Sequence, residues 1–107
     1  MRLFHFFRNT ADMNAGVAEC KTNDGAVLLD VRTEEEYRDG HIEGSVNIPL
    51  DRISSVENIV KDKSTPLYVH CLSGGRSGQA VSYLKQIGYT NVKNIGGISS
   101  YRGKVVK

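Results

Sequence analysis

The sequence has few of the residues that mark a metal centre or a disulfide framework. Its 107 residues include no tryptophan, two cysteines and three histidines. Cys20 and Cys71 lie far apart in the chain, and the histidines are isolated from one another. Zinc sites and small disulfide scaffolds both need closely spaced ligands or several cysteine pairs. We therefore expect no bound metal and no disulfide framework.

The sequence also lacks an excess of charge of one sign and a long apolar run. Its 14 basic and 12 acidic side chains give a net charge of +2, and the basic residues are scattered. This pattern argues against nucleic-acid or membrane partners. The N-terminal "MRLFHFF" is too short for a signal-peptide core or a membrane span. We predict one cytoplasmic domain over residues 1–107, with residues 1–9 as an N-terminal arm or edge strand.

What the sequence does contain is an alternation of strand-like and helix-like segments. The predicted strands are short apolar runs, at 26–30, 45–49, 67–70 and 91–95. The predicted helices carry apolar residues at helical spacing or cap signals, at 10–21, 33–40, 51–63 and 76–87. Thr33 and Glu36 have the spacing of a capping box, and Asp51 is predicted to cap the third helix. The alternation predicts an α/β fold with a mostly parallel central sheet flanked by helices.

The candidate functional site lies where these strands end. In parallel sheets, ligands gather at the carboxyl ends of the strands. Asp30, Cys71 and Gly96 each lie at or just past such an end, and Cys71 stands within "YVHCLSGGRSGQA", residues 68–80. Because a thiol reacts mainly as the thiolate, something positive must face its sulfur. His70 is a poor candidate, since successive strand side chains point to opposite faces.

The loop after Cys71 is a better source of positive charge. Gly74 and Gly75 allow backbone N–H groups to point inward as an anion-binding nest, and the helix starting near Arg76 adds its own N-terminal N–H groups. Such a nest stabilises a thiolate or a persulfide, while Arg76 and Ser77 hold an anionic substrate at the rim. We expect Gly75→Val to abolish activity, because a β-branched residue does not readily take unusual loop dihedrals.

Each of these residues also has a structural interpretation. A lone cysteine is more often a small buried apolar residue, and we assign that role to Cys20, which shares an apolar helix face with Met13 and Val17. Cys71 differs because a buried filler needs no glycine pair and helix start behind it. Arg76 alternatively is an ordinary first-turn residue, and Ser73 and Ser77 are turn or cap residues. No Gly-Lys-Ser/Thr follows the glycines, which excludes the usual phosphate-binding loop.

Two segments resemble the rhodanese family. "LLDVRTEEEYRDGHIEGSVNIP", residues 28–49, is similar to the family's first signature, and "YVHCLSGGRSGQAVSYLKQIGYTNVKNIGGISSY", residues 68–101, is similar to its active-site half. The resemblance implies a rhodanese-like α/β fold and makes Cys71 the sulfur-accepting nucleophile. It also implies an active-site loop and a supporting set that shapes the site. The loop residues are Leu72, Ser73, Gly74, Gly75, Arg76 and Ser77, and the supporting residues are Asp30, Arg32 and His41.

The resemblance implies a thiosulfate sulfurtransferase without a cofactor. A small anionic donor such as thiosulfate would leave a Cys71 persulfide, and a thiol or cyanide acceptor would remove the sulfur. Two alternatives stay open: a persulfide relay to a sulfur-relay protein, and a non-catalytic binding module. A related phosphatase or arsenate reductase is disfavoured, because only four residues separate Cys71 from Arg76 and a phosphate needs a longer loop. Tyr101 stands about where the family often has a tryptophan.

Overall fold

The computed structural model describes residues 12–107. Its centre is a parallel sheet of four strands in the order β3-β1-β4-β5. These strands are β1 (Val27–Asp30), β3 (Val46–Asn47), β4 (Leu67–Cys71) and β5 (Val92–Gly97). An antiparallel pair, β2 (His41–Ile42) with β6 (Val105–Val106), lies beside it. The predicted α/β class with a mostly parallel sheet is confirmed. The arm predicted for residues 1–9 lies outside the described residues.

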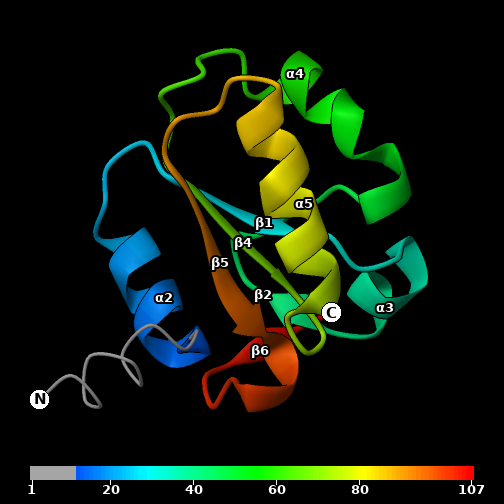
Figure 1. Cartoon of the computed structure of the whole chain (residues 1–107). Helices are drawn as coiled ribbons and strands as arrows, with labels where there is room; N and C mark the ends of the chain where they lie inside the picture. Colours follow the sequence, from blue (N-terminus) through cyan, green and yellow to red (C-terminus); the bar gives the residue numbers. More distant parts are fainter. Residues whose placement is uncertain (1–11) are drawn as a thin grey trace, which may run out of the picture.

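Helices cover both faces of the sheet (Figure 1). One face carries α5 (Gly75–Gln86), the 3-10 helix η1 (Leu50–Ser55) and α4 (Val56–Ile59). The other carries α2 (Met13–Lys21), with η2 (Ile98–Ser100) near its start. The short helix α3 (Glu34–Asp39) follows β1 at the carboxyl end of the sheet. This arrangement leaves the ends of β1, β4 and β5 as neighbours at one edge.

The apolar core is divided between the two faces because strand side chains alternate. In β4, Leu67, Val69 and Cys71 belong to the cluster under α5. Tyr68, between them, packs with Met13 and other residues of the α2 face. All five β4 residues are buried, as expected for a central parallel strand covered on both sides.

Two predicted caps have different outcomes. The capping box is present: the Thr33 hydroxyl accepts from the Glu36 amide, and the Glu36 carboxylate accepts from the Thr33 amide. The single helix over 51–63 with Asp51 as its cap is wrong. That segment is split into η1 and α4, with Arg52 at non-helical dihedrals (φ −124°, ψ 23°). Because the Leu50 amide donates to the Val31 carbonyl, the chain is tied to the end of β1 as η1 begins.

Candidate active site

Cys71 is the last residue of β4, and its sulfur faces the loop that follows. The Gly74 amide donates a hydrogen bond to Cys71 Sγ at 3.0 Å, and Ser77 Oγ lies 3.4 Å from the same sulfur. The amides of Ser73 and Ser77 also point toward it. The chain therefore surrounds one side of the sulfur with N–H groups from the loop and from the first turn of α5. This is the inward-facing arrangement on which the nucleophile assignment depends.

These hydrogen bonds change the acidity of the thiol. Burial of Cys71 raises its pKa, but the Ser77 hydroxyl and the amides of Ser77, Gly74 and Ser73 together outweigh burial, so the pKa of Cys71 is lowered from its ordinary value. Hydrogen bonds to the charged form favour that form. Cys20 shows the opposite: burial on α2 raises the pKa of its thiol, as for a structural cysteine. The two thiols of the chain thus have opposite shifts.

Cys71 is enclosed, whereas the loop after it is exposed. The residue is 1% exposed, although Leu72 beside it is 43% exposed and Ser73 is also at the surface. The loop residues therefore face solvent while the thiol itself is buried. A reagent has to present a narrow terminal atom to reach this sulfur.

The unusual dihedral of the loop lies at Gly74, not at Gly75. Gly74 has φ 111° and ψ −13°, in a region that residues with a Cβ rarely adopt. Gly75 is the first residue of α5, has no positive φ, and has open space around the position of a Cβ. The dihedral argument behind Gly75→Val is therefore wrong, and it applies to Gly74. Gly74 aims its amide at Cys71 Sγ through this turn.

Asn94 of β5 holds the loop in place, and sequence reasoning missed it. Its Nδ2 donates to the Gly74 carbonyl at 3.1 Å, and its Oδ1 accepts from Ser77 Oγ at 2.8 Å and from the Gly96 amide at 3.0 Å. The pairing of β4 with β5 shifts register here, from Val69↔Asn94 to His70↔Gly96. No spacing in the sequence indicates this contact, because the irregularity that creates it arises only between strands.

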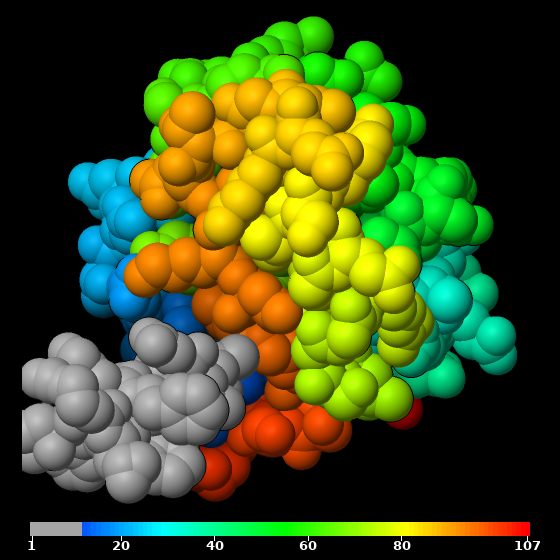
Figure 2. All heavy atoms as spheres, viewed as in Figure 1, coloured from blue at the N-terminus to red at the C-terminus, as the bar shows by residue number. Residues whose placement is uncertain are grey.

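Arg76 is paired with a carboxylate. Its Nη1 and Nη2 donate to the two oxygens of Glu36 at 2.7 and 3.1 Å, and both side chains are about one-third exposed. The hydrogen bond from Arg76 is the main cause that lowers the pKa of Glu36 to about 2. Figure 2 shows the first turn of α5, in yellow-green, at the surface beside α3, in teal. Arg76, which was predicted to bind an anionic substrate, is thus already paired with Glu36. The sequence indicated Glu36 only as part of a capping box.

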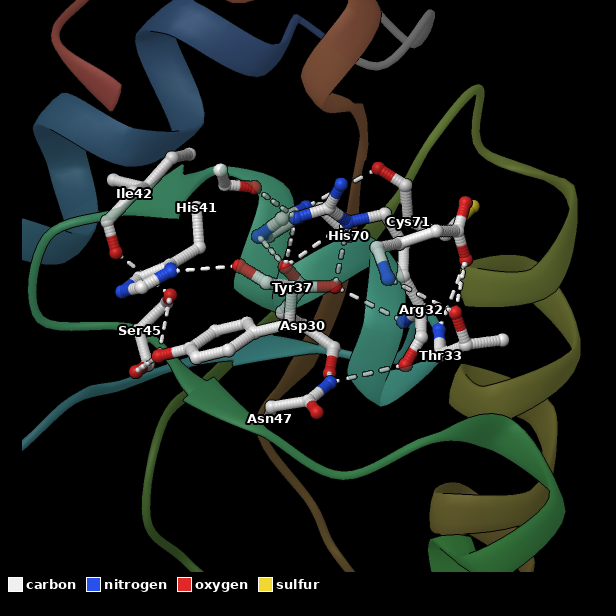
Figure 3. Close-up of polar contacts among 12 residues, drawn as sticks. Asp30, Arg32, Thr33, Tyr37, His41, Ile42, Ser45, Asn47, His70 and Cys71 are labelled. Carbon is white, nitrogen blue, oxygen red and sulfur yellow. Dashed lines mark hydrogen bonds and ion pairs between the residues drawn. The ribbon is translucent and has the colours of Figure 1, made fainter. Parts of the chain in front are cut away.

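Three buried groups meet at the ends of β1 and β4 (Figure 3). Arg32 Nε and Nη2 donate to the Asp30 carboxylate at 2.8 to 3.1 Å, and Asp30 also accepts from the Arg32 amide at 2.9 Å. His70 Nε2 lies 3.8 Å from Asp30 Oδ2, and Nδ1 lies 3.2 Å from the Cys71 carbonyl. His70 therefore faces this cluster and not the sulfur, as strand alternation predicts. Burial lowers its pKa and favours the neutral ring.

His41 lies apart from the sulfur, in β2. Its ring stacks on Tyr37 with centroids 3.8 Å apart, and Nδ1 lies 2.8 Å from the Tyr37 carbonyl. Tyr37 in turn donates from its hydroxyl to the Ser45 carbonyl at 2.6 Å. Figure 3 shows this stack next to the Asp30 cluster. The functional roles predicted for Asp30, Arg32 and His41 stay predictions, and their contacts are those of bracing groups.

Tyr101 packs against the apolar cluster of the α2 face, whereas Cys71 belongs to the cluster of the α5 face. Tyr101 and Cys71 therefore pack in different apolar clusters, on opposite faces of the sheet.

Within residues 12–107, no group of three or more histidine, cysteine, aspartate or glutamate side chains is placed to hold a metal ion. In the same residues, no helix is long and apolar enough to cross a membrane.

The fold and the site together define an α/β domain in which a thiol at a strand end meets a loop of inward-facing amides. The chain belongs to the rhodanese-like domain family, whose model matches residues 14–104. It is 39% identical over 80 residues to the thiosulfate sulfurtransferase PspE of Escherichia coli, covering 74% of this chain and 77% of PspE. A solved structure described as a rhodanese with anions from E. coli superposes with a TM-score of 0.72 and 37% identity, covering 77% of this chain and 98% of that one.

Some relatives are much longer than this chain. The protein named adenylyltransferase and sulfurtransferase uba4, from Ogataea parapolymorpha, is 35% identical over 95 residues. That match covers 88% of this chain but only 24% of uba4. Membership of this family supports sulfurtransferase chemistry, and it does not by itself assign the donor or the acceptor.

Proposed function

We propose that this protein transfers sulfane sulfur from a small anionic donor such as thiosulfate, through a persulfide on Cys71, to a thiol or cyanide acceptor. The observation that carries the proposal is the amide of Gly74 at 3.0 Å from Cys71 Sγ, within a set of N–H groups that lowers the pKa of this thiol. PspE, a relative of similar length, carries the name thiosulfate sulfurtransferase. No metal or organic cofactor enters the reaction.

The reaction has two displacement steps. In the first, the Cys71 thiolate attacks the outer sulfur of thiosulfate, a new S–S bond forms, and sulfite leaves with the electron pair of the broken S–S bond. The persulfide keeps one negative charge on its outer sulfur, which the loop amides stabilise. In the second, the acceptor attacks that outer sulfur, and Cys71 leaves as the thiolate. The narrow terminal sulfur of the donor suits a thiol that is only 1% exposed.

The first test of this proposal is an intact mass after incubation with thiosulfate and removal of the excess donor. We expect the wild type to gain one sulfur atom and to lose it on addition of cyanide. Cys71→Ser should gain none, whereas Cys20→Ala, which removes the structural thiol of α2, should behave as the wild type does. A wild type that gains no sulfur, or a Cys71→Ser variant that gains it equally, contradicts the proposal.

A persulfide relay to a protein partner is the second candidate. The exposed apolar side chain of Leu72, directly after the nucleophile, favours contact with another protein surface. Leu72→Lys should then slow transfer to the partner without slowing uptake from thiosulfate. Fast turnover on small donors and acceptors, unchanged by Leu72→Lys, would favour the small-molecule reaction. The cytoplasmic location is part of the same proposal and stays a prediction.

A further inference from the structure

The Ser77 hydroxyl lies beside the reacting sulfur and has more acceptors around it than it has hydrogens. Ser77 is completely buried, and its Oγ lies 2.8 Å from Asn94 Oδ1 and 3.4 Å from Cys71 Sγ. The carbonyl oxygens of Gly74 and Gly96 lie 3.1 and 3.4 Å from the same Oγ. A hydroxyl has a single hydrogen to donate, so these four acceptors compete for it. Of the four, the sulfur is the one whose charge changes during sulfur transfer.

The Asn94 side chain is held in one orientation from both ends of its amide. Nδ2 donates to the Gly74 carbonyl at 3.1 Å, and Oδ1 accepts from the Gly96 amide at 3.0 Å. Turning the amide over would set its N–H groups against the Gly96 N–H and its oxygen against the Gly74 carbonyl. The oxygen of Asn94 therefore faces the Ser77 hydroxyl, and it lies at the shortest of the four acceptor distances.

Both protonation states of Cys71 are fully hydrogen-bonded in this arrangement. In the thiol state the S–H donates to Ser77 Oγ, and the Ser77 hydroxyl donates to Asn94 Oδ1. In the thiolate state the hydroxyl turns to the sulfur, and Oδ1 keeps the hydrogen bond from the Gly96 amide. No buried acceptor loses its last donor, so the turn costs little, and the new hydrogen bond is charge-assisted. Burial opposes the ionisation of Cys71, and the Ser77 hydroxyl is the largest of the causes that lower its pKa.

Resting on the proposed function, we propose that Asn94 is a positioning residue for sulfur transfer, whose Oδ1 holds the Ser77 hydroxyl while Cys71 Sγ is uncharged and releases it when the thiolate forms. Ionisation sends the thiol proton to solvent, and the hydroxyl turns to the sulfur. When the thiolate attacks the donor, Sγ gives its electron pair to the new S–S bond and the hydroxyl returns to Asn94. When the acceptor takes the outer sulfur, that electron pair returns to Sγ and the hydroxyl turns back to it. The hydroxyl hydrogen stays on Ser77 Oγ throughout.

A double-mutant cycle tests this role through the pKa of Cys71, measured from the ultraviolet absorbance of the thiolate with Cys20→Ala throughout. With asparagine at position 94, Ser77→Ala should lower the ionisation constant of Cys71 roughly tenfold, because the thiolate loses a charge-assisted hydrogen bond. In Asn94→Asp, a carboxylate replaces the amide and holds the hydroxyl in both states of the thiol. Adding Ser77→Ala to Asn94→Asp should then change the ionisation constant less than about twofold. The added charge is common to both members of this second pair, so it cancels in the comparison.

Asn91→Asp is the matched control, because Asn91 is an exposed residue directly before β5 and gains the same charge. In this variant Ser77→Ala should keep its roughly tenfold effect. If Asn94→Asp does not fold, NMR of the Asn94 side-chain amide gives a second measurement. Its signals should shift as Cys71 ionises, and they should shift much less in Ser77→Ala.

Two results overturn the role of Asn94 while the sulfur-transfer proposal stands. One is an equal effect of Ser77→Ala with asparagine and with aspartate at position 94. The other is an Asn94 amide shift that persists undiminished in Ser77→Ala. A wild type that forms no persulfide overturns the sulfur-transfer proposal instead, because the cycle measures the ionisation of the thiol alone.

Discussion

At the residue scale, the loop that faces the sulfur packs so closely against Gly97 that a side chain with a Cβ does not fit there. A Cβ built on this residue would lie 2.0 Å from the Leu72 carbonyl oxygen and 2.5 Å from Ser73 Cα. Both atoms belong to the backbone of the loop, so no flexible side chain is there to move aside. The Ser99 amide, which donates to the Leu72 carbonyl at 3.1 Å, holds the loop against this strand end. Gly97 is therefore a positioning residue for the amides around Cys71.

We expect Gly97→Ala to displace the loop and to lower the rate of sulfur uptake by Cys71 at least roughly tenfold, with a loss of about 1–3 kcal/mol in stability from overpacking. Rates of persulfide formation by mass and denaturant unfolding check the two parts. Gly78→Ala is the control: Gly78 lies inside α5, and its Cβ would make an ordinary contact with Asn94 Nδ2 at 3.5 Å. Uptake by Gly97→Ala at the wild-type rate would show that the loop does not need this close approach.

The sequence indicated Cys71 and its loop because the thiol, the glycines and the helix start are consecutive. It did not indicate Asn94 and Gly97, which come from the next strand and reach the loop only through the irregular pairing of β4 with β5. The choice of Gly75 over Gly74 failed for a related reason. Two adjacent glycines show that a turn is needed, but which of them takes the positive φ depends on where α5 begins.

At the scale of elements, the Glu36–Arg76 pair joins α3 to the start of α5. The two carboxylate oxygens accept from Arg76, and Oε1 also accepts from the Thr33 amide and hydroxyl of the capping box. The Glu36 side chain thus takes part in the capping box at the start of α3 and in the ion pair with the first turn of α5. The link places α3 beside the loop that surrounds the sulfur.

We expect Glu36→Gln to reduce the free energy of unfolding by about 1 kcal/mol at pH 7, a discounted figure because the pair is partly exposed. The pKa of Glu36 is lowered from 4.5 to about 2 in the folded protein, so its contribution is present above pH 4.5 and is lost as the pH falls toward 2. Denaturant unfolding of the wild type and the variant should converge over this window. Glu35→Gln, an exposed carboxylate of the same helical turn, should show no such convergence, and a constant difference for Glu36→Gln would contradict the argument.

Most elements could be predicted from local pattern, and the exceptions have clear causes. The apolar runs indicated all four strands of the central sheet, and the capping box marked the start of α3. The β2–β6 pair was not predicted, since two-residue strands have no periodicity and Val105 and Val106 pair with His41 and Ile42 across most of the chain. The helix over 51–63 was predicted too long, because apolar spacing does not distinguish a 3-10 turn followed by a short helix from one regular helix.

At the scale of the whole molecule, the fold buries a charged cluster where β1 and β4 end. Asp30 and His70 are completely buried, and Arg32 is 5% exposed. Arg32 satisfies both oxygens of Asp30 and also donates to the Gly40 carbonyl at 2.8 Å, which links the sheet to the end of α3. Among the described residues, His70 Nε2 is a buried side-chain atom without a hydrogen-bond partner. The fold thus places the neutral His70 ring beside the buried ion pair of Asp30 and Arg32.

This burial sets how global stability depends on pH. Burial lowers the pKa of His70, with the carboxylate of Asp30 opposing it, so His70 takes up a proton less readily folded than unfolded. Below the ordinary value of 6.5 the unfolded chain binds more protons than the folded one, and stability falls as the pH falls. One such proton contributes a slope of at most about 1.4 kcal/mol per pH unit.

We expect the free energy of unfolding of the wild type to decrease from pH 7 to pH 5, and His70→Asn to show a shallower decrease. Asparagine does not titrate, and its side-chain amide still donates to the Cys71 carbonyl in place of Nδ1, so the variant isolates the protonation of the ring. Denaturant unfolding at pH 7, 6 and 5 gives the two slopes, and ring-proton NMR of His70 gives the titration directly. Parallel slopes would contradict the argument, because His70 would then bind protons equally in the folded and unfolded chain. A ring that titrates above 6.5 in the folded protein would show that the buried cluster stabilises the charged imidazolium instead.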